Sequence, residues 1–131
     1  MKSATAALER LLGIMERLRA PDGCPWDREQ TPHTLRPYVL EETYEVLEAI
    51  DGGDVREHCE ELGDLLLQIV FQAQLRKEEG RFDFADVAEA ISNKLVSRHP
   101  HVFGDSQVKD AEGVLKQWAQ LKRAEKKAAA K

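Results

Sequence analysis

Apolar residues recur at helical spacing along most of the chain, and no stretch shows the strict alternation of a half-buried strand. Proline and glycine interrupt this spacing between residues 20 and 34, which predicts a loop there. Helices are expected over about residues 4–19, 37–52, 54–79, 84–98 and 109–126. The pattern therefore predicts an all-α fold, a helical bundle of about four to five helices.

Short polar and glycine-rich sites set the expected helix boundaries. The acidic helix begins between Pro32 and Pro37, because proline is tolerated only in a first turn. Gly52 and Gly53 end that helix, and Asp54 is a plausible N-cap for the next one. The next helix should stop at Gly80, and Asp83 or Asp86 should cap the one after it.

Acidic residues share one face on each of the two helices that flank the turn at residues 51–54. Positions three or four apart lie on the same side of a helix, so their carboxylates gather there. The first helix contributes Glu41, Glu42 and Glu45, and the second contributes a stripe of Glu57, Glu61, Asp64 and the amide Gln68.

The turn also predicts how the two acidic faces meet. Glu45 lies seven residues before Gly52 and Glu61 eight after Gly53. At about 1.5 Å of rise per residue, an antiparallel hairpin places Glu45 level with Glu61, and Glu42 level with Asp64. Four carboxylates would then face one another across the seam between the helices.

Two interpretations of this acidic seam are open. It can be a solvated acidic face, or it can hold a hard divalent cation, since clustered carboxylates without a cation repel one another and their pKa values rise. Apolar residues surround the second helix almost completely, which predicts a buried helix and favours the metal site. The metal ligands are then Glu42, Glu45, Glu61 and Asp64, with Mg²⁺ as the expected ion and Mn²⁺ as an alternative.

Other residues suited to a ligand lie outside the acidic helices. Trp26 is either a packing anchor for the loop, the favoured interpretation, or a surface on which a base stacks. Arg28 can neutralise phosphate or be solvated. Lys94 and Arg98 project from one face near a helix end, where they can stabilise the helix C-terminus or clamp a phosphate. The histidines of the segment 99–101, expected to be extended, are assigned to structural hydrogen bonds rather than a metal.

Composition limits the possible partners. The chain has 131 residues and a net charge of −5, which gives no general attraction to a nucleic acid polymer or an anionic membrane.

Cys24 and Cys59 form no redox or disulfide motif, and the start lacks a signal-like apolar region, so a cytoplasmic protein is expected. One domain is expected over residues 1–126, followed by a solvated tail at 127–131.

Three sequence blocks resemble the MazG nucleoside triphosphate pyrophosphohydrolases. The central one is the acidic signature, Glu41-Glu42-x-x-Glu45 followed by Glu61-x-x-Asp64. The flanking blocks are Gly23-Cys24-Pro25-Trp26-Asp27 through Gln30-Thr31 and Arg98-His99-Pro100-His101-Val102-Phe103-Gly104. The resemblance extends from about Leu11 to Lys122, nearly the whole chain.

The resemblance implies an all-α homodimer or tetramer, joined through its central helices, that hydrolyses nucleoside triphosphates with Mg²⁺. It implies that the four carboxylates bind the metal, that Glu41 is a supporting ligand or base, and that the products are a monophosphate and pyrophosphate. It also implies nucleotide contacts from Lys94, Arg98, Trp118 and Lys122, which favours the phosphate clamp. Many family members carry two such domains in tandem, and this sequence has one. The alternative is a non-catalytic helical module that binds nucleotide or a protein partner.

Overall fold

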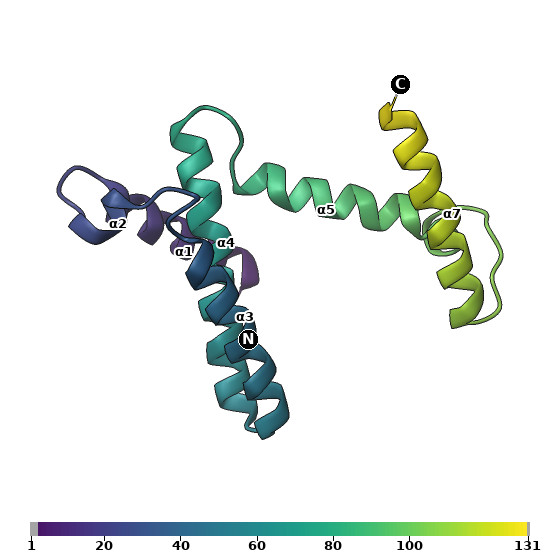
Figure 1. Cartoon of the computed structure of the whole chain (residues 1–131), viewed down its shortest axis with the longest axis horizontal. Helices are drawn as coiled ribbons and strands as arrows, with labels where there is room; N and C mark the ends of the chain where they lie inside the picture. Colours follow the sequence, from purple (N-terminus) through teal and green to yellow (C-terminus); the bar gives the residue numbers. More distant parts are fainter. Residues whose placement is uncertain (1–2, 131) are drawn as a thin grey trace. The chain divides into compact units, whose positions relative to one another are not determined.

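The structure, a computed structural model, describes residues 3–130 and divides after Phe84 into two compact units. Helices account for the regular structure of the described residues, which confirms the all-α prediction (Figure 1). The first unit contains α1 (Ala4–Arg19), α2 (Pro25–Glu29), α3 (Arg36–Gly52) and α4 (Val55–Glu78). Helices α5 (Phe84–Arg98), α6 (Pro100–Phe103) and α7 (Ala111–Ala130) follow. The short helices α2 and α6 were not predicted.

Helices α3 and α4 form the antiparallel hairpin that the sequence predicts (Figure 1). Gly53 adopts a left-handed φ of 77°, which glycine reaches without steric cost, and its amide donates to the carbonyls of Ala49 and Ile50. Asp54 caps α4, since its Oδ1 accepts from the amides of Arg56 at 2.9 Å and Glu57 at 3.2 Å. These contacts fix the turn, and with it the register of the two acidic faces.

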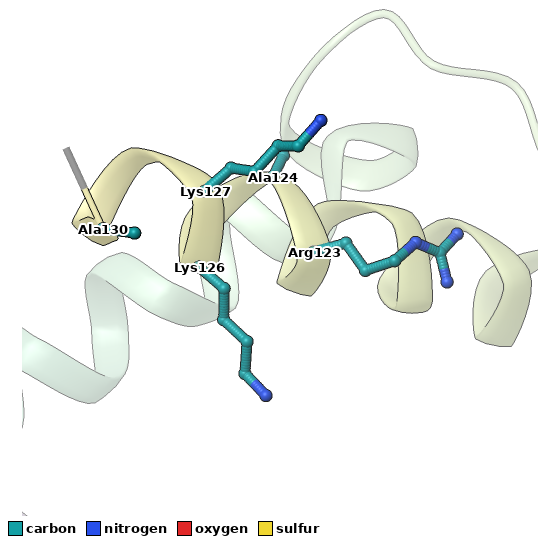
Figure 2. A pocket seen from close by; sticks show the side chains of 5 residues that line it. All are labelled: Arg123, Ala124, Lys126, Lys127 and Ala130. Carbon is teal, nitrogen blue, oxygen red and sulfur yellow. The ribbon is translucent and has the colours of Figure 1, made fainter.

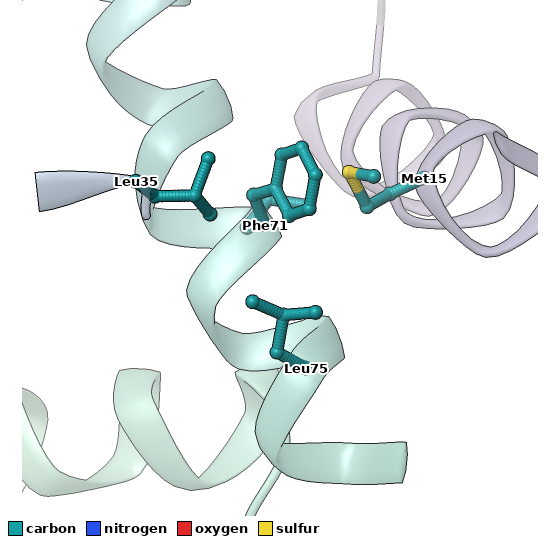
Figure 3. Close-up of a cluster of buried hydrophobic side chains, with 5 residues drawn as sticks. Met15, Leu35, Phe71 and Leu75 are labelled. Carbon is teal, nitrogen blue, oxygen red and sulfur yellow. The ribbon is translucent and has the colours of Figure 1, made fainter. Parts of the chain in front are cut away.

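A small apolar core joins α1, the start of α3 and the C-terminal half of α4. Met15, Leu35, Phe71 and Leu75 converge in it (Figure 3), and each is at most 4% exposed. Met15 belongs to the stripe predicted for the first helix. The core therefore holds the base of the hairpin and leaves the acidic half, nearer the turn, outside it.

Arg19 ties the loop at residues 20–34 to this core. Its guanidinium makes a bidentate pair with Glu78 at 2.6 and 3.0 Å, and its Nη1 donates to the Asp27 carbonyl at 2.7 Å. Gly23 lies so close to the Leu18 carbonyl that a Cβ would be 2.2 Å from it, so only glycine fits. The loop is thus folded tightly, and α2 forms within it.

The sequence predicts that α4 is buried, and a single copy of the chain covers only part of this helix. Leu62 is 47% exposed and Ile69 43% exposed. The reason is that α3 and α1 cover only part of the helix circumference, and apolar composition alone does not supply a neighbour. Apolar residues of α5 are also open, with Ile91 and Leu95 about half exposed.

In the second unit, Pro100 ends α5 as expected, but the following residues form the helical turn α6 and not an extended segment. His99 Nδ1 contacts the Leu95 carbonyl at 2.5 Å, and His101 Nδ1 contacts Gln117 Nε2 at 3.0 Å. Hydrogen bonding therefore accounts for both histidines, as predicted. Helix α7 extends four residues beyond the predicted end, and those residues are exposed.

No helix among residues 3–130 is both long and apolar enough to span a bilayer. The cytoplasmic location and the single domain over 1–126 stay predictions.

The Arg19–Glu78 pair makes a pH-dependent contribution to stability. Hydrogen bonds from Arg19 lower the pKa of the Glu78 carboxyl, so its stabilisation is complete above the ordinary pKa of 4.5 and is lost as pH falls through the lower folded value. We expect Glu78→Gln to lower the free energy of unfolding at pH 7 by up to about 1 kcal/mol, since the carboxylate is partly exposed and screened. Urea titrations at pH 7 and pH 3 should show the difference only at pH 7.

Glu79→Gln is the control, because the ion pairs of Glu79 are with Arg76 and Arg81 and not with Arg19. The pH-dependent contribution of the Arg19–Glu78 pair would be contradicted by either of two results. One is an equal loss of unfolding free energy in both variants, and the other is a loss for Glu78→Gln that persists at pH 3.

Candidate metal centre

Three of the predicted carboxylates come together on the α3–α4 seam. Each of Glu42, Glu61 and Asp64 offers an oxygen, and these oxygens all lie within 4.8 Å of one another. Glu42 and Glu61 are partly buried and Asp64 is exposed. The helical register derived from the turn therefore places the expected groups opposite one another.

The carboxylates repel one another, as their pKa values show. Partial burial raises the pKa of Glu42, and the charges of Asp64, Glu41 and Glu45 raise it further. Partial burial also raises the pKa of Glu61, helped by the charges of Asp64, Glu45 and Glu42 and by a hydrogen bond with Asp64. Glu45 thus acts electrostatically on both residues, although it lies outside the closest group of three.

The donor set fits a hard divalent cation. Carboxylate oxygens are the ligands that Mg²⁺ and similar ions prefer, and a cation at their centre would remove the repulsion. The group differs from an ordinary solvated face in having acids from two helices within ligand reach of one another. The geometry therefore supports the metal interpretation over the alternative left open by the sequence.

Gln68 lies on the same stripe, one helical turn beyond Asp64, but is absent from the predicted site residues. The residue is 8% exposed, and its Oε1 is buried without a hydrogen-bond partner. A buried acceptor without a donor costs about 1–3 kcal/mol. The spacing of Glu57, Glu61, Asp64 and Gln68 was the available signal for it, since all four share one face.

Trp26 combines the two interpretations that the sequence left open. Its ring makes edge contacts with Phe71 in the core, at 6.5 Å between centroids, and with Tyr38, at 5.5 Å. It is nevertheless 47% exposed, so it anchors the loop and also presents an aromatic surface. The Arg28 guanidinium donates to the Pro21 carbonyl and is therefore partly engaged within the loop.

The other basic and aromatic residues predicted to contact nucleotide belong to the second unit. Arg98 pairs with Glu125, and Trp118 packs edge-on against His99 at 5.1 Å between centroids. The Trp118 Nε1 is buried without a partner. Lys94 and Lys122 are exposed on α5 and α7.

A surface hollow along α7 does not bring charged groups from different helices together, in contrast to the acidic seam. Its lining residues are Arg123, Ala124, Lys126, Lys127 and Ala130, all from one helix, and the three cationic side chains point in different directions (Figure 2). A single helix presents a convex surface, so these cations are best explained as solvated.

Comparison with known proteins identifies the family. The family model described as MazG nucleotide pyrophosphohydrolase domain matches residues 30–103, more than half of the chain. The chain belongs to the MazG family. The match includes all five acids of the signature, from Glu41 to Asp64, as well as Lys94 and Arg98.

Full-length MazG relatives agree over most of this sequence. A nucleoside triphosphate pyrophosphohydrolase of Escherichia coli is 58% identical over 91% of the chain, which corresponds to 46% of the relative. A nucleoside triphosphate pyrophosphohydrolase/pyrophosphatase MazG of Thermotoga maritima is 50% identical over 96% of the chain and 48% of its own length. The chain spans about half the length of these relatives.

A solved structure also matches the MazG fold. The crystal structure of a mazG-related protein from Thermotoga maritima aligns with a TM-score of 0.71 and 29% identity, covering 88% of this chain and 98% of that one. The helical architecture is therefore shared with an experimentally determined member of the group.

Repulsion within the site predicts a stabilising substitution. Asp64 raises the pKa of both Glu42 and Glu61, so the folded chain binds protons more tightly there and loses stability as pH rises through those values. We expect Asp64→Asn to raise the melting temperature by a few degrees at pH 7.5 in a chelating buffer. The gain should shrink as the pH is lowered to 4, because protonation of Glu42 and Glu61, whose pKa values are raised, removes the charges that Asp64 repels.

The control is Glu57→Gln, which removes the same charge from the same helix outside the close group. Glu57 lies in the first turn of α4, where a carboxylate favours the helix, so this change should not stabilise. A melting temperature for Asp64→Asn at or below that of the unsubstituted chain at pH 7.5 would refute the repulsion argument.

Proposed function

We propose that this MazG domain is a Mg²⁺-dependent nucleoside triphosphate pyrophosphohydrolase. It hydrolyses ribo- and deoxyribonucleoside triphosphates to the monophosphate and pyrophosphate, in a nucleotide-pool house-cleaning role. The observation that carries the proposal is the convergence of Glu42, Glu61 and Asp64 from two helices. The family and the names of its relatives support the same activity.

The proposed chemistry follows from charge. A triphosphate is strongly anionic and cannot approach several carboxylates without cations between them. Glu42, Glu45, Glu61 and Asp64 would hold Mg²⁺, which would supply that positive charge and lower the pKa of a water molecule placed for attack at the α-phosphorus. Glu41 lies beside Glu42 on α3 and is assigned as the base that accepts the proton of the water.

The remaining roles concern the nucleotide. Lys94, Arg98 and Lys122 are assigned to the phosphates, where positive charge stabilises the pyrophosphate leaving group. Trp26 and Trp118 are also assigned to nucleotide contacts, because an aromatic ring offers a surface to a base, and Arg28 is assigned to phosphate. The orphan oxygen of Gln68 is a further acceptor beside the metal ligands.

Removing a metal ligand should abolish turnover. We expect Glu42→Ala and Asp64→Ala to reduce Mg²⁺-dependent pyrophosphate release by at least about 100-fold, because the remaining acids cannot hold the ion in place. Pyrophosphate and phosphate release are measured over a panel of triphosphates, with Mg²⁺, with Mn²⁺ and with chelator. Glu48→Ala is the control, since Glu48 is an exposed acid on α3 outside the close group.

Unchanged turnover in Glu42→Ala or Asp64→Ala would refute the assignment of the site. Absence of turnover in the folded, unsubstituted chain across the whole panel would instead favour the non-catalytic binding module.

We also propose that the domain assembles as a homodimer or tetramer through α3 and α4. Exposed apolar residues, from 36% to 81% exposed, recur at helical spacing on both helices, which is typical of a helix face that packs against another helix. They are Leu40, Tyr44 and Leu47 on α3, and Val55, Leu62, Leu66 and Ile69 on α4.

A charge placed on this stripe should dissociate the assembly. We expect Leu62→Glu to shift the mass in sedimentation equilibrium towards that of one chain, because an unpaired carboxylate is costly in an apolar interface. Arg56→Gln alters the net charge by the same amount at a highly exposed position on α4 and should leave the mass unchanged. A monomeric unsubstituted chain, or a Leu62→Glu variant with unchanged mass, would contradict the proposal.

A further inference from the structure

Glu125 lies directly against Arg98 in the second unit. Its Oε2 accepts from the Arg98 Nη2 at 2.9 Å, and its Oε1 lies 3.4 Å from Nε. The Arg98 side chain is 25% exposed and that of Glu125 42% exposed. The carboxylate thus occupies the fork of the guanidinium, the edge that would otherwise be offered to a planar or tetrahedral anion.

The surrounding contacts hold this pair in register. Trp118 packs edge-on against His99, and the Gln117 side chain contacts His101 at 3.0 Å. These contacts join α7 to the end of α5 and to α6. Arg98 and Glu125 are therefore brought together by packed neighbours, although 27 residues separate them in the chain.

Two further cations act on the same carboxylate. Arg98 lowers the pKa of Glu125, first through its hydrogen bonds and then through its charge, and Lys94 and Lys122 lower the pKa further by their charges. Lys94 lies one helical turn before Arg98, and Lys122 lies three residues before Glu125. An anion therefore already sits among the three cations assigned to phosphate.

A carboxylate and a phosphate compete for the same donors on arginine. We propose that Glu125 is an internal competitor at the anion site formed by Lys94, Arg98 and Lys122, and that a nucleotide phosphate displaces its carboxylate from Arg98. The identity of the anion rests on the proposed function, whereas the competition does not. Glu125 then neutralises Arg98 and offsets part of the charge of Lys94 and Lys122 when no ligand is bound, and it weakens the binding of every anion that needs Arg98.

If Glu125 instead positioned Arg98 for phosphate, removing its carboxylate would change the affinity for anions in the opposite direction. A carboxylate that merely orients Arg98 for phosphate would strengthen anion binding, and its removal would weaken it. The sign of the change in affinity therefore distinguishes competition from positioning.

Isothermal titration of the full chain with inorganic pyrophosphate, without divalent cations, tests the proposal independently of turnover. We expect Glu125→Gln to bind pyrophosphate about two- to fivefold more tightly, the upper part of the range for removing one exposed charge pair from competition. Glu112→Gln is the matched control, because it removes the same charge from α7 at a site paired only weakly with Lys116, at 3.8 Å. It should change the affinity less than about twofold, through net charge alone.

Weaker or unchanged binding by a Glu125→Gln variant with an unaltered circular dichroism spectrum would overturn the proposal. So would equal gains in Glu125→Gln and Glu112→Gln, or no binding by any variant. Glu125→Asp keeps the charge but shortens the reach to Arg98, and it should bind with intermediate affinity. If Glu125→Gln does not fold, the affinity of Glu125→Asp for pyrophosphate tests the competition instead.

A turnover assay separates this proposal from the proposed function. If the chain hydrolyses triphosphates, Glu125→Gln should raise kcat/KM, since the freed Arg98 binds phosphate in the ground state as well as in the transition state. If the chain does not hydrolyse them, the pyrophosphate titration still gives the answer.

Discussion

Repulsion among carboxylates across the α3–α4 seam is the constraint on which the rest of the structure depends. Glu42, Glu61 and Asp64 offer oxygens within 4.8 Å of one another, and burial together with like charge raises the pKa of the first two. A hairpin with this feature holds its register only because something else fixes it. The Gly53–Asp54 turn fixes one end, and the core of Met15, Leu35, Phe71 and Leu75 fixes the other. The acids lie between these anchors, where function rather than stability explains them.

The register of the acidic seam could be predicted because it depends only on local rules. A glycine in the left-handed region, an aspartate cap and a constant helical rise suffice to place Glu42 opposite Asp64. The boundaries of α1 and α3 follow from similarly local signals. Nothing in that argument needs a contact between residues distant in the chain.

What the sequence did not reveal depends on distant contacts. Arg19 folds the loop by reaching Glu78, 59 residues away, so α2 could not be read from a segment rich in proline. The Arg98–Glu125 pair depends on how the Pro100 turn directs α7, which no periodicity specifies. Apolar composition predicts burial of α4, because leucines surround the helix. It does not say whether the covering surface comes from the same chain. Leu62 and Ile69 remain open in one copy.

The two units treat charge in opposite ways. Among residues 3–130, no ion pair involves Glu42, Glu61 or Asp64, so a divalent cation from solution would relieve the repulsion within the first cluster. The second unit gathers Lys94, Arg98 and Lys122, and the Glu125 carboxylate already offsets part of their charge. Binding of a cation at the acidic seam is therefore favoured by relief of repulsion, while binding of an anion at the cationic cluster is opposed by the loss of an ion pair. The existing electrostatics favour a ligand at the first cluster and oppose one at the second.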